Sequence, residues 1–382
     1  MPISLYSGPL TEVDDHFVDK SNLFANEHIK PYAEHWEQTR QQPEKTLRMA
    51  ISQFAGIRIP KNLGGNGGSA ATIARVYENL AKIDIGFTGA LAVHNNVTIA
   101  ASLMENTSLR GRYLGKLMSG EAIGAFLLTE PDVGSDATSI QMSATEKNNK
   151  YIINGSKAWV TNGVNADFLS VFTQTIPGSS AKGIAGFVID ADMPGVSAKS
   201  AYNMLGNHAM GVNELTFSNC TADAESMVFA PGAGFKAAMY GINVARFGVA
   251  AMCNGALEGG LNTAVDYAKK RETFGRPIIN HQGLQWQLAE VATQLEASRM
   301  LTYRVAEIID SGENVTVMAA HAKKFATRAA FEGLSTAMQV MGANGLLREN
   351  PLARQMSGAR VTYYMDGTTE IQNVVIGRSL LG

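Results

Sequence analysis

Two segments in the middle of the chain combine residue types that suit the binding of a flat or anionic ligand. Thr129–Asp136 places hydroxyls and carboxylates around Gly134, in a turn whose backbone N–H groups are able to face an anion or a ring. In Lys157–Gly163, Trp159 stands two residues from Thr161, and the period of two in a strand directs both side chains to one face. An ordinary turn and ordinary core packing remain alternatives for these two segments.

Two further segments stand near the C-terminus. Arg271–Gly275 follows a predicted long helix, where a cation stabilises either the helix dipole or a bound pyrophosphate. Asp366–Glu370 opens the predicted final helix, and the part from Asp366 to Thr368 is able to cap it. Each of these four segments alone gives weak support for a function. The functional interpretation therefore depends on their order along one chain.

Most other catalytic signatures are absent from the sequence. HExxH, CxxC, Walker A and GxSxG motifs do not occur, and no GxGxxG motif follows a predicted strand. The histidines show no metal-ligand spacing, and the two cysteines, Cys220 and Cys253, form no disulfide framework. The formal net charge of −2 provides no basic surface for nucleic acid. We therefore expect no metal site and no nucleic-acid partner.

The N-terminal stretch gives no targeting signal. It lacks a basic region followed by an apolar region, and it is acidic where a mitochondrial leader is basic. The sequence contains no uninterrupted run of about 18 apolar residues, so no transmembrane helix is expected. We expect a cytoplasmic protein, and a processed mitochondrial chain remains an alternative.

The spacing of apolar residues and of turn residues along the chain predicts three blocks. Residues 11–120 have mainly helical spacing of apolar residues, with a helix starting at Ser69 after the loop Gly64–Gly68. Residues 121–230 hold short apolar runs separated by turn residues, and Asn154–Gly155 predicts a hairpin turn. Long helices follow at 236–269, 282–311 and 314–341. This order indicates a mostly helical α+β protein with domains at 1–121, 122–231 and 232–382, and it excludes a doubly wound sheet.

Taken in order, these segments resemble the acyl-CoA dehydrogenase family. TEPDVGSD resembles the family's TEPxxGSD, NGSKAWVTNG its NGxKxWITNG, and RETFGRPIINHQGLQWQLAEVA its RxxFGxxIxxxQxxxxxLAxM. DGTTEIQ stands where the family usually has EGTxEIQ. The resemblance runs from about residue 11 to the C-terminus. It implies an N-terminal helical domain, a middle β-domain, a C-terminal four-helix-bundle domain and FAD as cofactor.

The resemblance also implies site residues. FAD contacts are implied for Phe126, Leu128, Thr129, Gly134, Ser135, Trp159, Thr161, Arg271, Phe274, Gln282, Gln339, Gly342, Thr368 and Glu370. Substrate contacts are implied for Ser135, Asn243, Arg246 and Gly367, with a solvated helix position as the alternative for Asn243. The contacts of Arg271, Phe274 and Gln282 are implied to reach the FAD of a neighbouring subunit, so a homo-oligomer, usually a tetramer, is implied.

The reaction implied by the resemblance is α,β-dehydrogenation of an acyl thioester, in which a carboxylate removes the α-proton and the β-hydrogen leaves as hydride to the flavin. Here the family's glutamate is replaced by Asp366, which is about 1.5 Å shorter in reach. The family's second base position is occupied by Ala245, so Asp366 is the candidate base. Because a displacement of about 1 Å can cost on the order of 100-fold in rate, either the pocket holds the substrate closer or the scaffold serves another task.

Several partners and functions follow from the resemblance. The expected partners are an acyl-CoA substrate and an electron-transfer flavoprotein. An acyl group on a carrier protein is an alternative substrate. A flavin relative with different chemistry, and a homologue without turnover, remain alternative functions.

Overall fold

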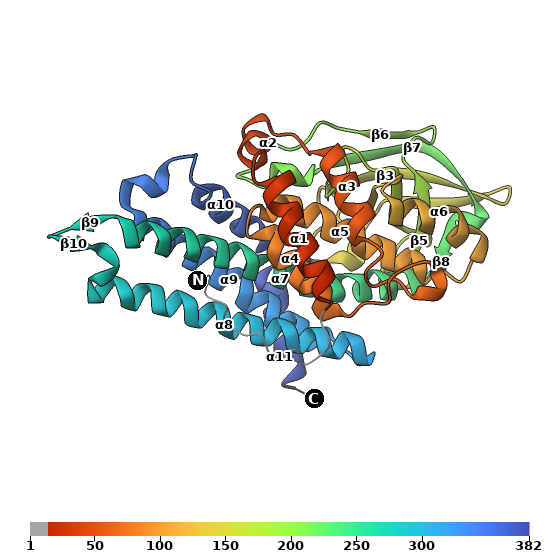
Figure 1. Ribbon diagram of the computed structural model, residues 1–382. Helices are drawn as coiled ribbons and strands as arrows, with labels where there is room; N and C mark the ends of the chain where they lie inside the picture. Colours follow the sequence, from red (N-terminus) through yellow and green to blue (C-terminus); the bar gives the residue numbers. More distant parts are fainter. Residues whose placement is uncertain (1–13, 382) are drawn as a thin grey trace.

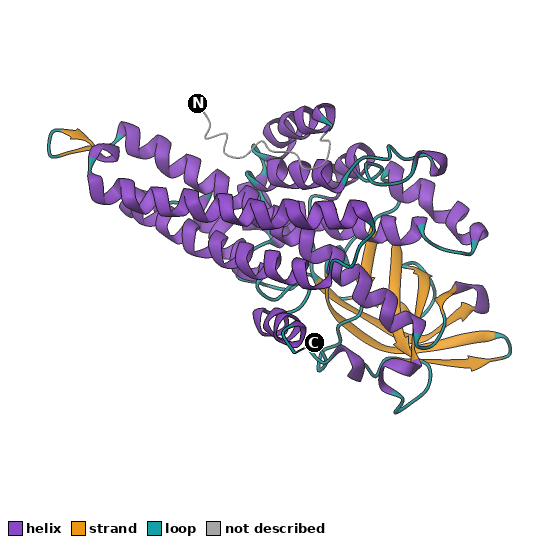
Figure 2. Cartoon of the chain, turned by 90° about the horizontal axis from the view of Figure 1, so that it is seen from below, coloured by secondary structure: helices purple, strands orange, loops and turns teal. Residues whose placement is uncertain are grey.

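The computed structural model describes residues 14–381, and the predicted lack of an N-terminal leader falls largely on residues outside this range. Its elements follow the predicted order of helices, strands and helices (Figures 1 and 2). The N-terminal helices are α1 Asp15–Phe24, α2 Ala33–Thr39, α3 Glu44–Phe54, α4 Ala70–Ala81, α5 Ile85–Ser102 and α6 Thr107–Ser119. Within the described range, no helix combines the length and the apolar character that crossing a membrane requires.

Helix α4 begins where the sequence predicts. The Ser69 side chain accepts a hydrogen bond from the Thr72 backbone N–H at 3.1 Å and caps the helix. The preceding glycine loop is a tight connection, because a Cβ on Gly65 would lie 2.2 Å from the Ile59 carbonyl oxygen. The predicted helix start and the structural function of the loop are therefore confirmed.

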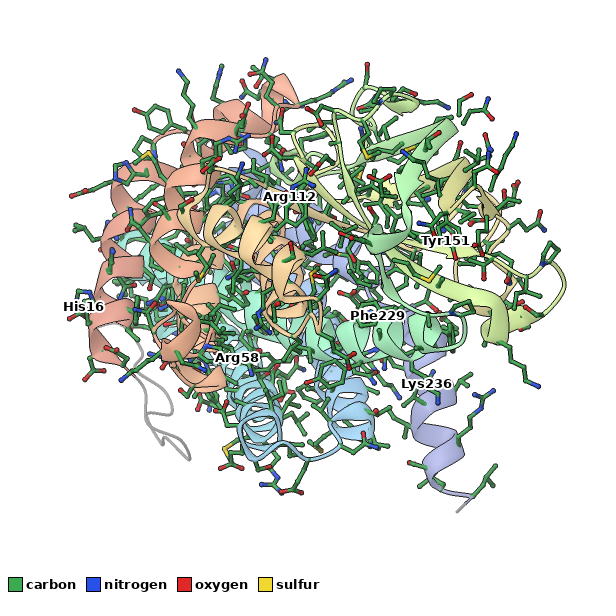
Figure 3. The ribbon with its side chains drawn as sticks, turned by 90° about the vertical axis from the view of Figure 1, so that its right-hand side faces the viewer. His16, Arg58, Arg112, Tyr151, Phe229 and Lys236 are labelled. Carbon is green, nitrogen blue, oxygen red and sulfur yellow. The ribbon has the colours of Figure 1, made fainter. Side chains whose placement is uncertain are left out.

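The middle block forms a single main sheet. Its order is β6-β7-β3-β2-β4-β5-β8, with β1 parallel to β4. The strands are β1 Gly124–Leu127, β2 Ser143–Lys147, β3 Lys150–Val160, β4 Phe168–Gln174, β5 Ile184–Asp190, β6 Val196–Ala198, β7 Asn213–Asp223 and β8 Met227–Phe229. The chain passes from β8 through residues 230–232 into α7, and the two elements contact one another; Phe229 at the end of β8 and Lys236 in the first turn of α7 are labelled in Figure 3.

The predicted hairpin turn at Asn154–Gly155 is wrong. Both residues lie inside β3, where the pairing with β7 shifts register. The turn between β2 and β3 is formed by Asn148 and Asn149, which adopt φ angles of 53° and 60°. Asparagine tolerates this left-handed conformation, so a two-residue turn needs no glycine here.

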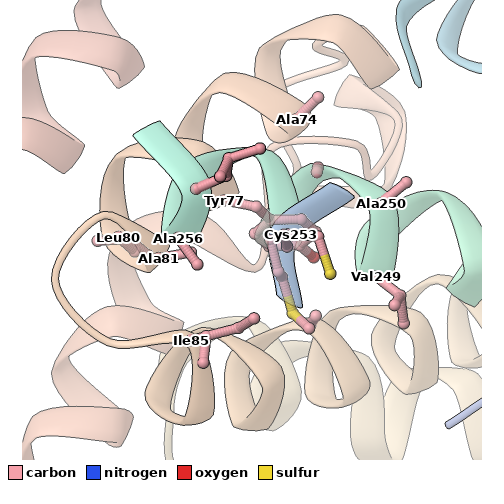
Figure 4. Packing of buried hydrophobic residues seen from close by; sticks show 14 of the residues in the cluster. Ala74, Tyr77, Leu80, Ala81, Ile85, Val249, Ala250, Cys253 and Ala256 are labelled. Carbon is pink, nitrogen blue, oxygen red and sulfur yellow. The ribbon is translucent and has the colours of Figure 1, made fainter. Parts of the chain in front are cut away.

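The C-terminal block is a bundle of long helices, as the resemblance implies. Its elements are α7 Ala233–Lys270, β9 Glu272–Thr273, β10 Arg276–Pro277, α8 Gln282–Ser311, α9 Thr316–Met341, α10 Leu352–Thr362 and α11 Thr369–Ser379. Helices α4 and α5 of the first block pack on α7 through buried side chains that include Tyr77, Ala250 and Cys253 (Figure 4). Arg299 on α8 joins the two helical blocks, since its guanidinium bonds the buried carboxylates of Glu78 and Glu258.

Candidate active site

Asp366 lies in the turn between α10 and α11. Its φ angle is 51°, a left-handed conformation that aspartate and asparagine adopt more readily than most residues. The N-cap of α11 is Thr368, whose Oγ1 accepts from the Ile371 N–H at 3.4 Å. The prediction that the part from Asp366 to Thr368 caps the last helix is therefore confirmed through Thr368, and the alternative that Asp366 itself is the cap is wrong.

Three side chains hold the backbone of this turn. Arg246 on α7 donates from Nε to the Asp366 carbonyl oxygen at 3.0 Å. Gln372 on α11 donates from Nε2 to the Gly367 carbonyl oxygen at 2.9 Å, and Lys323 on α9 donates to the same oxygen at 2.7 Å. Donors from three helices thus fix the point from which the carboxylate projects.

Burial and charge set the protonation of the group. Burial raises the pKa of Asp366 to about 6, and the nearby positive charges of Lys323 and Arg246 oppose this rise. Burial lowers the pKa of Lys323 to about 8, and the Asp366 carboxylate opposes that fall. At neutral pH the site therefore holds a carboxylate with a raised proton affinity, which suits a general base.

Arg246 and Asn243 form a support for the turn. Arg246 is buried, and its Nη1 donates to Asn243 Oδ1 at 2.8 Å. The Asn243 amide in turn donates to Thr316 Oγ1 at 2.9 Å. Asn243 is half-buried and bonded at both ends, so the expectation of a solvated helix position is wrong. The substrate contacts of Asn243, Arg246 and Gly367 stay predictions.

Helix α7 connects this turn to the β-domain. A Cβ on Gly241 would lie 4.0 Å from Phe126 Cε2, so the end of β1 packs on α7 just over one turn before Arg246. Leu128 is buried near the same helix and packs with Ala238. The structure therefore brings the strand that leads to Thr129 close to the helix that supports Asp366.

A buried ion pair fixes the Thr129 segment. Lys157 Nζ donates to Glu130 Oε1 at 2.8 Å and to the Leu128 carbonyl oxygen at 2.7 Å. The Ala158 N–H donates to the Thr129 carbonyl oxygen at 2.9 Å. The segment that follows is a turn, as predicted, and it leaves the two predicted flavin contacts Gly134 and Ser135 exposed.

Trp159 does not follow the predicted alternation. Its φ angle is 58°, and the pairing of β3 with β7 shifts register between Lys157 and Val160. β3 ends at Val160, so Thr161 lies beyond the strand and the period of two does not place it beside Trp159. The Trp159 side chain is 60% exposed and packs against Tyr202, with ring centroids 4.6 Å apart. A large exposed ring next to the Thr129 segment fits a flat ligand.

The remaining cofactor candidates fall into two groups. Thr368 and exposed Glu370 lie at the start of α11, beside the Asp366 turn. The second group is exposed at the far end of the bundle and comprises Arg271, Phe274, Gln282, Gln339 and Gly342. Phe274 is 96% exposed on the β9–β10 hairpin, and both views place this hairpin at the end opposite the β-sheet (Figures 1 and 2).

The residues present fit a flavin dinucleotide. At the start of α11, Thr369 Oγ1 and Gln372 Oε1 are buried and have no hydrogen-bond partner within residues 14–381. Such buried polar atoms are normally satisfied, so a polar ligand group beside α11 accounts for them. Trp159 and Phe274 expose large aromatic rings, and their contacts with FAD stay predictions.

The sequence predictions missed the side chains that hold the site together. Lys323 and Lys157 are fully buried, and neither is among the predicted site residues, although Lys157 begins the segment Lys157–Gly163. A signal exists for Lys323, because it stands among buried alanines at helical spacing in α9, with Ala319 and Ala326 on either side. A lysine in such an apolar stripe indicates a buried charge with a partner.

Comparisons with known proteins agree with this geometry. Three domain families match the chain: acyl-CoA dehydrogenase N-terminal domain at residues 11–121, middle domain at residues 125–220 and C-terminal domain at residues 232–381. An acyl-CoA dehydrogenase of Bacillus subtilis is 37% identical over 94% of this chain and 95% of its own length. The structure of butyryl-CoA dehydrogenase from Megasphaera elsdenii has a TM-score of 0.96 at 31% identity, covering 99% of this chain and 100% of that one. A glutaryl-CoA dehydrogenase from Mycobacterium smegmatis, solved in complex with FADH2, has a TM-score of 0.91 at 26% identity and covers 96% of this chain and 94% of its own.

Proposed function

Because the chain belongs to the acyl-CoA dehydrogenase family of FAD-dependent oxidoreductases, we propose that it catalyses the α,β-dehydrogenation of an acyl-CoA with Asp366 as the base. FAD, when bound, supplies the acceptor for the β-hydrogen, which leaves as hydride. The task of the protein is to hold the thioester, keep water away and remove the α-proton.

The observation that carries this proposal is the Asp366 carboxylate in its supported turn. Burial raises its pKa to about 6, which makes it a stronger base than an ordinary aspartate while it is still ionised at neutral pH. The α-proton of a thioester is weakly acidic, so both the raised basicity and a fixed position favour its removal. Ala245 offers no carboxylate at the family's second base position, so no other candidate stands at an expected site.

The backbone conformation supports an aspartate at this position. A φ angle of 51° is costly for glutamate and tolerated by aspartate, because the short polar side chain adopts left-handed conformations more easily. We infer that the turn, held by Arg246, Lys323 and Gln372, carries the shorter side chain to the substrate. In this proposal, the supported left-handed turn compensates for the loss of about 1.5 Å in side-chain reach.

The cofactor site is proposed to be shared between subunits. Trp159, Thr161 and Thr129 would hold the flavin ring, with Thr368 and Glu370 along the same chain. Arg271, Phe274 and Gln282 lie at the opposite end of the molecule, so one FAD reaches both groups only if two chains contribute (Figure 1). This placement supports a homo-oligomer, for which a tetramer is the family expectation. The electron acceptor that we propose is an electron-transfer flavoprotein, as the family membership suggests.

Anaerobic mixing of the FAD-bound protein with a panel of acyl-CoAs tests the proposal. We expect loss of the flavin absorbance at 450 nm with at least one ester and formation of the matching enoyl-CoA. Absence of bleaching with every CoA ester, together with bleaching by the same acyl groups on a carrier protein, would replace acyl-CoA with a carrier-bound substrate. A protein that binds FAD and reacts with neither would contradict the proposed reaction.

A further inference from the structure

Lys323 is a fully buried lysine that faces the Asp366 turn from the middle of α9. Its ammonium group donates to the Gly367 carbonyl oxygen at 2.7 Å and to the Tyr363 carbonyl oxygen at 3.0 Å. These two carbonyls lie on either side of Asp366. Lys323 therefore spans the turn and binds it on both sides of the proposed base.

The charged or titratable groups around Lys323 come from two helices, α7 and α11, and from the turn. Asp366 attracts its charge most strongly, the Cys253 thiol on α7 and Glu370 on α11 act in the same direction, and Arg246 on α7 opposes. Cys253 contacts Thr362 Oγ1 at 3.4 Å, and burial raises the pKa of this thiol to about 11, so it is neutral over the working range. Asp366 is thus the group that gains most from a cation at this position.

If only two hydrogen bonds were needed, a lysine would be an unfavourable residue at this buried position because its charge must be desolvated. Removing an ammonium group from water costs several kcal/mol, which a neutral donor avoids. The Gly367 carbonyl already accepts from the neutral Gln372 amide, and the Asp366 carbonyl accepts from Arg246. What Lys323 adds to these bonds is a second positive charge, besides that of Arg246, which favours the ionised form of the Asp366 carboxyl against the effect of burial.

We propose that Lys323 is a positioning residue for the base: its two carbonyl bonds fix the Asp366–Gly367 turn, and its charge keeps the Asp366 carboxylate ionised. This proposal rests on Asp366 being the proton acceptor of the proposed reaction. The charge acts on protonation, whereas the hydrogen bonds act on position, and the two contributions respond differently to substitution. Removing the charge moves the pH dependence, and removing the bonds lowers the rate at every pH.

The test compares Lys323→Met, Lys323→Gln and Lys323→Arg in the FAD-bound protein. Lys324, the next residue on α9, is exposed, so Lys324→Met is the matched control for loss of a lysine charge. The rate of flavin reduction by a reactive acyl-CoA is measured from pH 5 to 9 under anaerobic conditions. Lys323→Gln keeps a donor without charge, and it serves as the decisive variant if Lys323→Met does not fold.

We expect the acid limb of the pH profile to move up by about one pH unit in Lys323→Gln and Lys323→Met, since a neighbouring opposite charge shifts a carboxyl pKa by about 1–3 units. A shift of about one unit lowers the rate about fivefold at pH 6 and leaves it nearly unchanged at pH 9. Lys323→Arg and Lys324→Met should keep the wild-type limb. A folded, FAD-bound Lys323→Gln whose limb coincides with that of the wild type would overturn the proposal.

A second measurement reads the Asp366 carboxyl without turnover. Carbon-13 NMR of protein labelled at the aspartate carboxyl carbons, with Asp366→Asn identifying the signal, follows its titration in wild type and Lys323→Gln. A higher midpoint in Lys323→Gln supports the role of the charge, and an equal midpoint overturns it. If no acyl thioester reduces the wild-type flavin, the proposed function fails, and this titration still decides whether Lys323 keeps Asp366 ionised.

Discussion

Replacing Asp366 by asparagine removes the proposed base and keeps the shape of its turn. Asparagine tolerates a φ angle of 51° as well as aspartate does, and the bonds from Arg246, Lys323 and Gln372 go to backbone carbonyls, so the substitution leaves them in place. General base catalysis contributes about 100- to 10,000-fold to a rate. We therefore expect flavin reduction by acyl-CoA to fall by at least about 100-fold while FAD remains bound.

The same substitution should stabilise the fold at high pH. Burial raises the pKa of Asp366 from 3.8 to about 6, which corresponds to a cost of about 3 kcal/mol for ionising it in the folded protein. A raised carboxyl pKa means that ionisation weakens the fold: the cost is absent below the unfolded pKa and is complete above the folded pKa. Asparagine does not ionise, so its stabilising effect grows through this window and is constant above about pH 6.

Two assays on one preparation check this prediction. Stopped-flow absorbance at 450 nm gives the rate of flavin reduction, and urea unfolding at pH 5 and pH 8 gives the stability difference. The stability gain of Asp366→Asn should be larger at pH 8 by about 1 kcal/mol. A gain that is equal at both pH values would refute the raised pKa of the Asp366 carboxyl, and a rate within threefold of the wild type would refute its role as the base.

Other substitutions test the turn, the flavin segment and the shared site. Asp366→Glu restores the longer side chain but places an unfavourable residue at positive φ, so thermal unfolding should show a loss of about 1–2 kcal/mol, and an unchanged midpoint would count against the backbone argument. Lys157→Met leaves the buried Glu130 carboxylate without its cationic partner, so urea unfolding should show a loss of about 3–5 kcal/mol together with weaker FAD retention. Lys150→Met, at the exposed start of β3, is the control, and equal stability of the two variants would contradict the importance of this pair. Phe274→Ser should reduce FAD retention on gel filtration without changing the circular dichroism of the helices, whereas full retention would argue against the two-chain site.

The fold was largely predictable because its elements are specified locally. Spacings of three and four residues between apolar side chains indicate the helices, and Ser69 caps α4 through an atom three residues away. The errors lie where pairing between distant segments decides the conformation. Asn154–Gly155 has the composition of a turn, but its pairing with β7 keeps both residues inside β3. Trp159 departs from alternation because the register shifts at the same strand pair.

The sequence predicted the candidate residues of the site but not the side chains that hold them in place. The motifs singled out Asp366 and Trp159, whose roles stay predictions, and both adopt positive φ angles that the sequence does not reveal. Lys323 was not found, because its carbonyl partners lie about forty residues away along the chain and are brought to it by the packing of α10 and α11 on α9. The helical spacing of Lys323 among alanines indicates that it is buried, but the sequence does not show which backbone atoms it binds, so its role beside the base is harder to predict than the base itself.

Exchange of the α-hydrogen with solvent tests the role of Asp366 most directly, because it needs no hydride transfer. The FAD-bound protein is incubated in D2O with an acyl-CoA analogue that carries sulfur in place of C3, and mass spectrometry follows deuterium at C2. We predict that the wild type catalyses this exchange and that Asp366→Asn slows it by at least about 100-fold, whereas Lys324→Met leaves it unchanged. Equal exchange by the wild type and Asp366→Asn would show that another group removes the proton and would contradict the proposed mechanism.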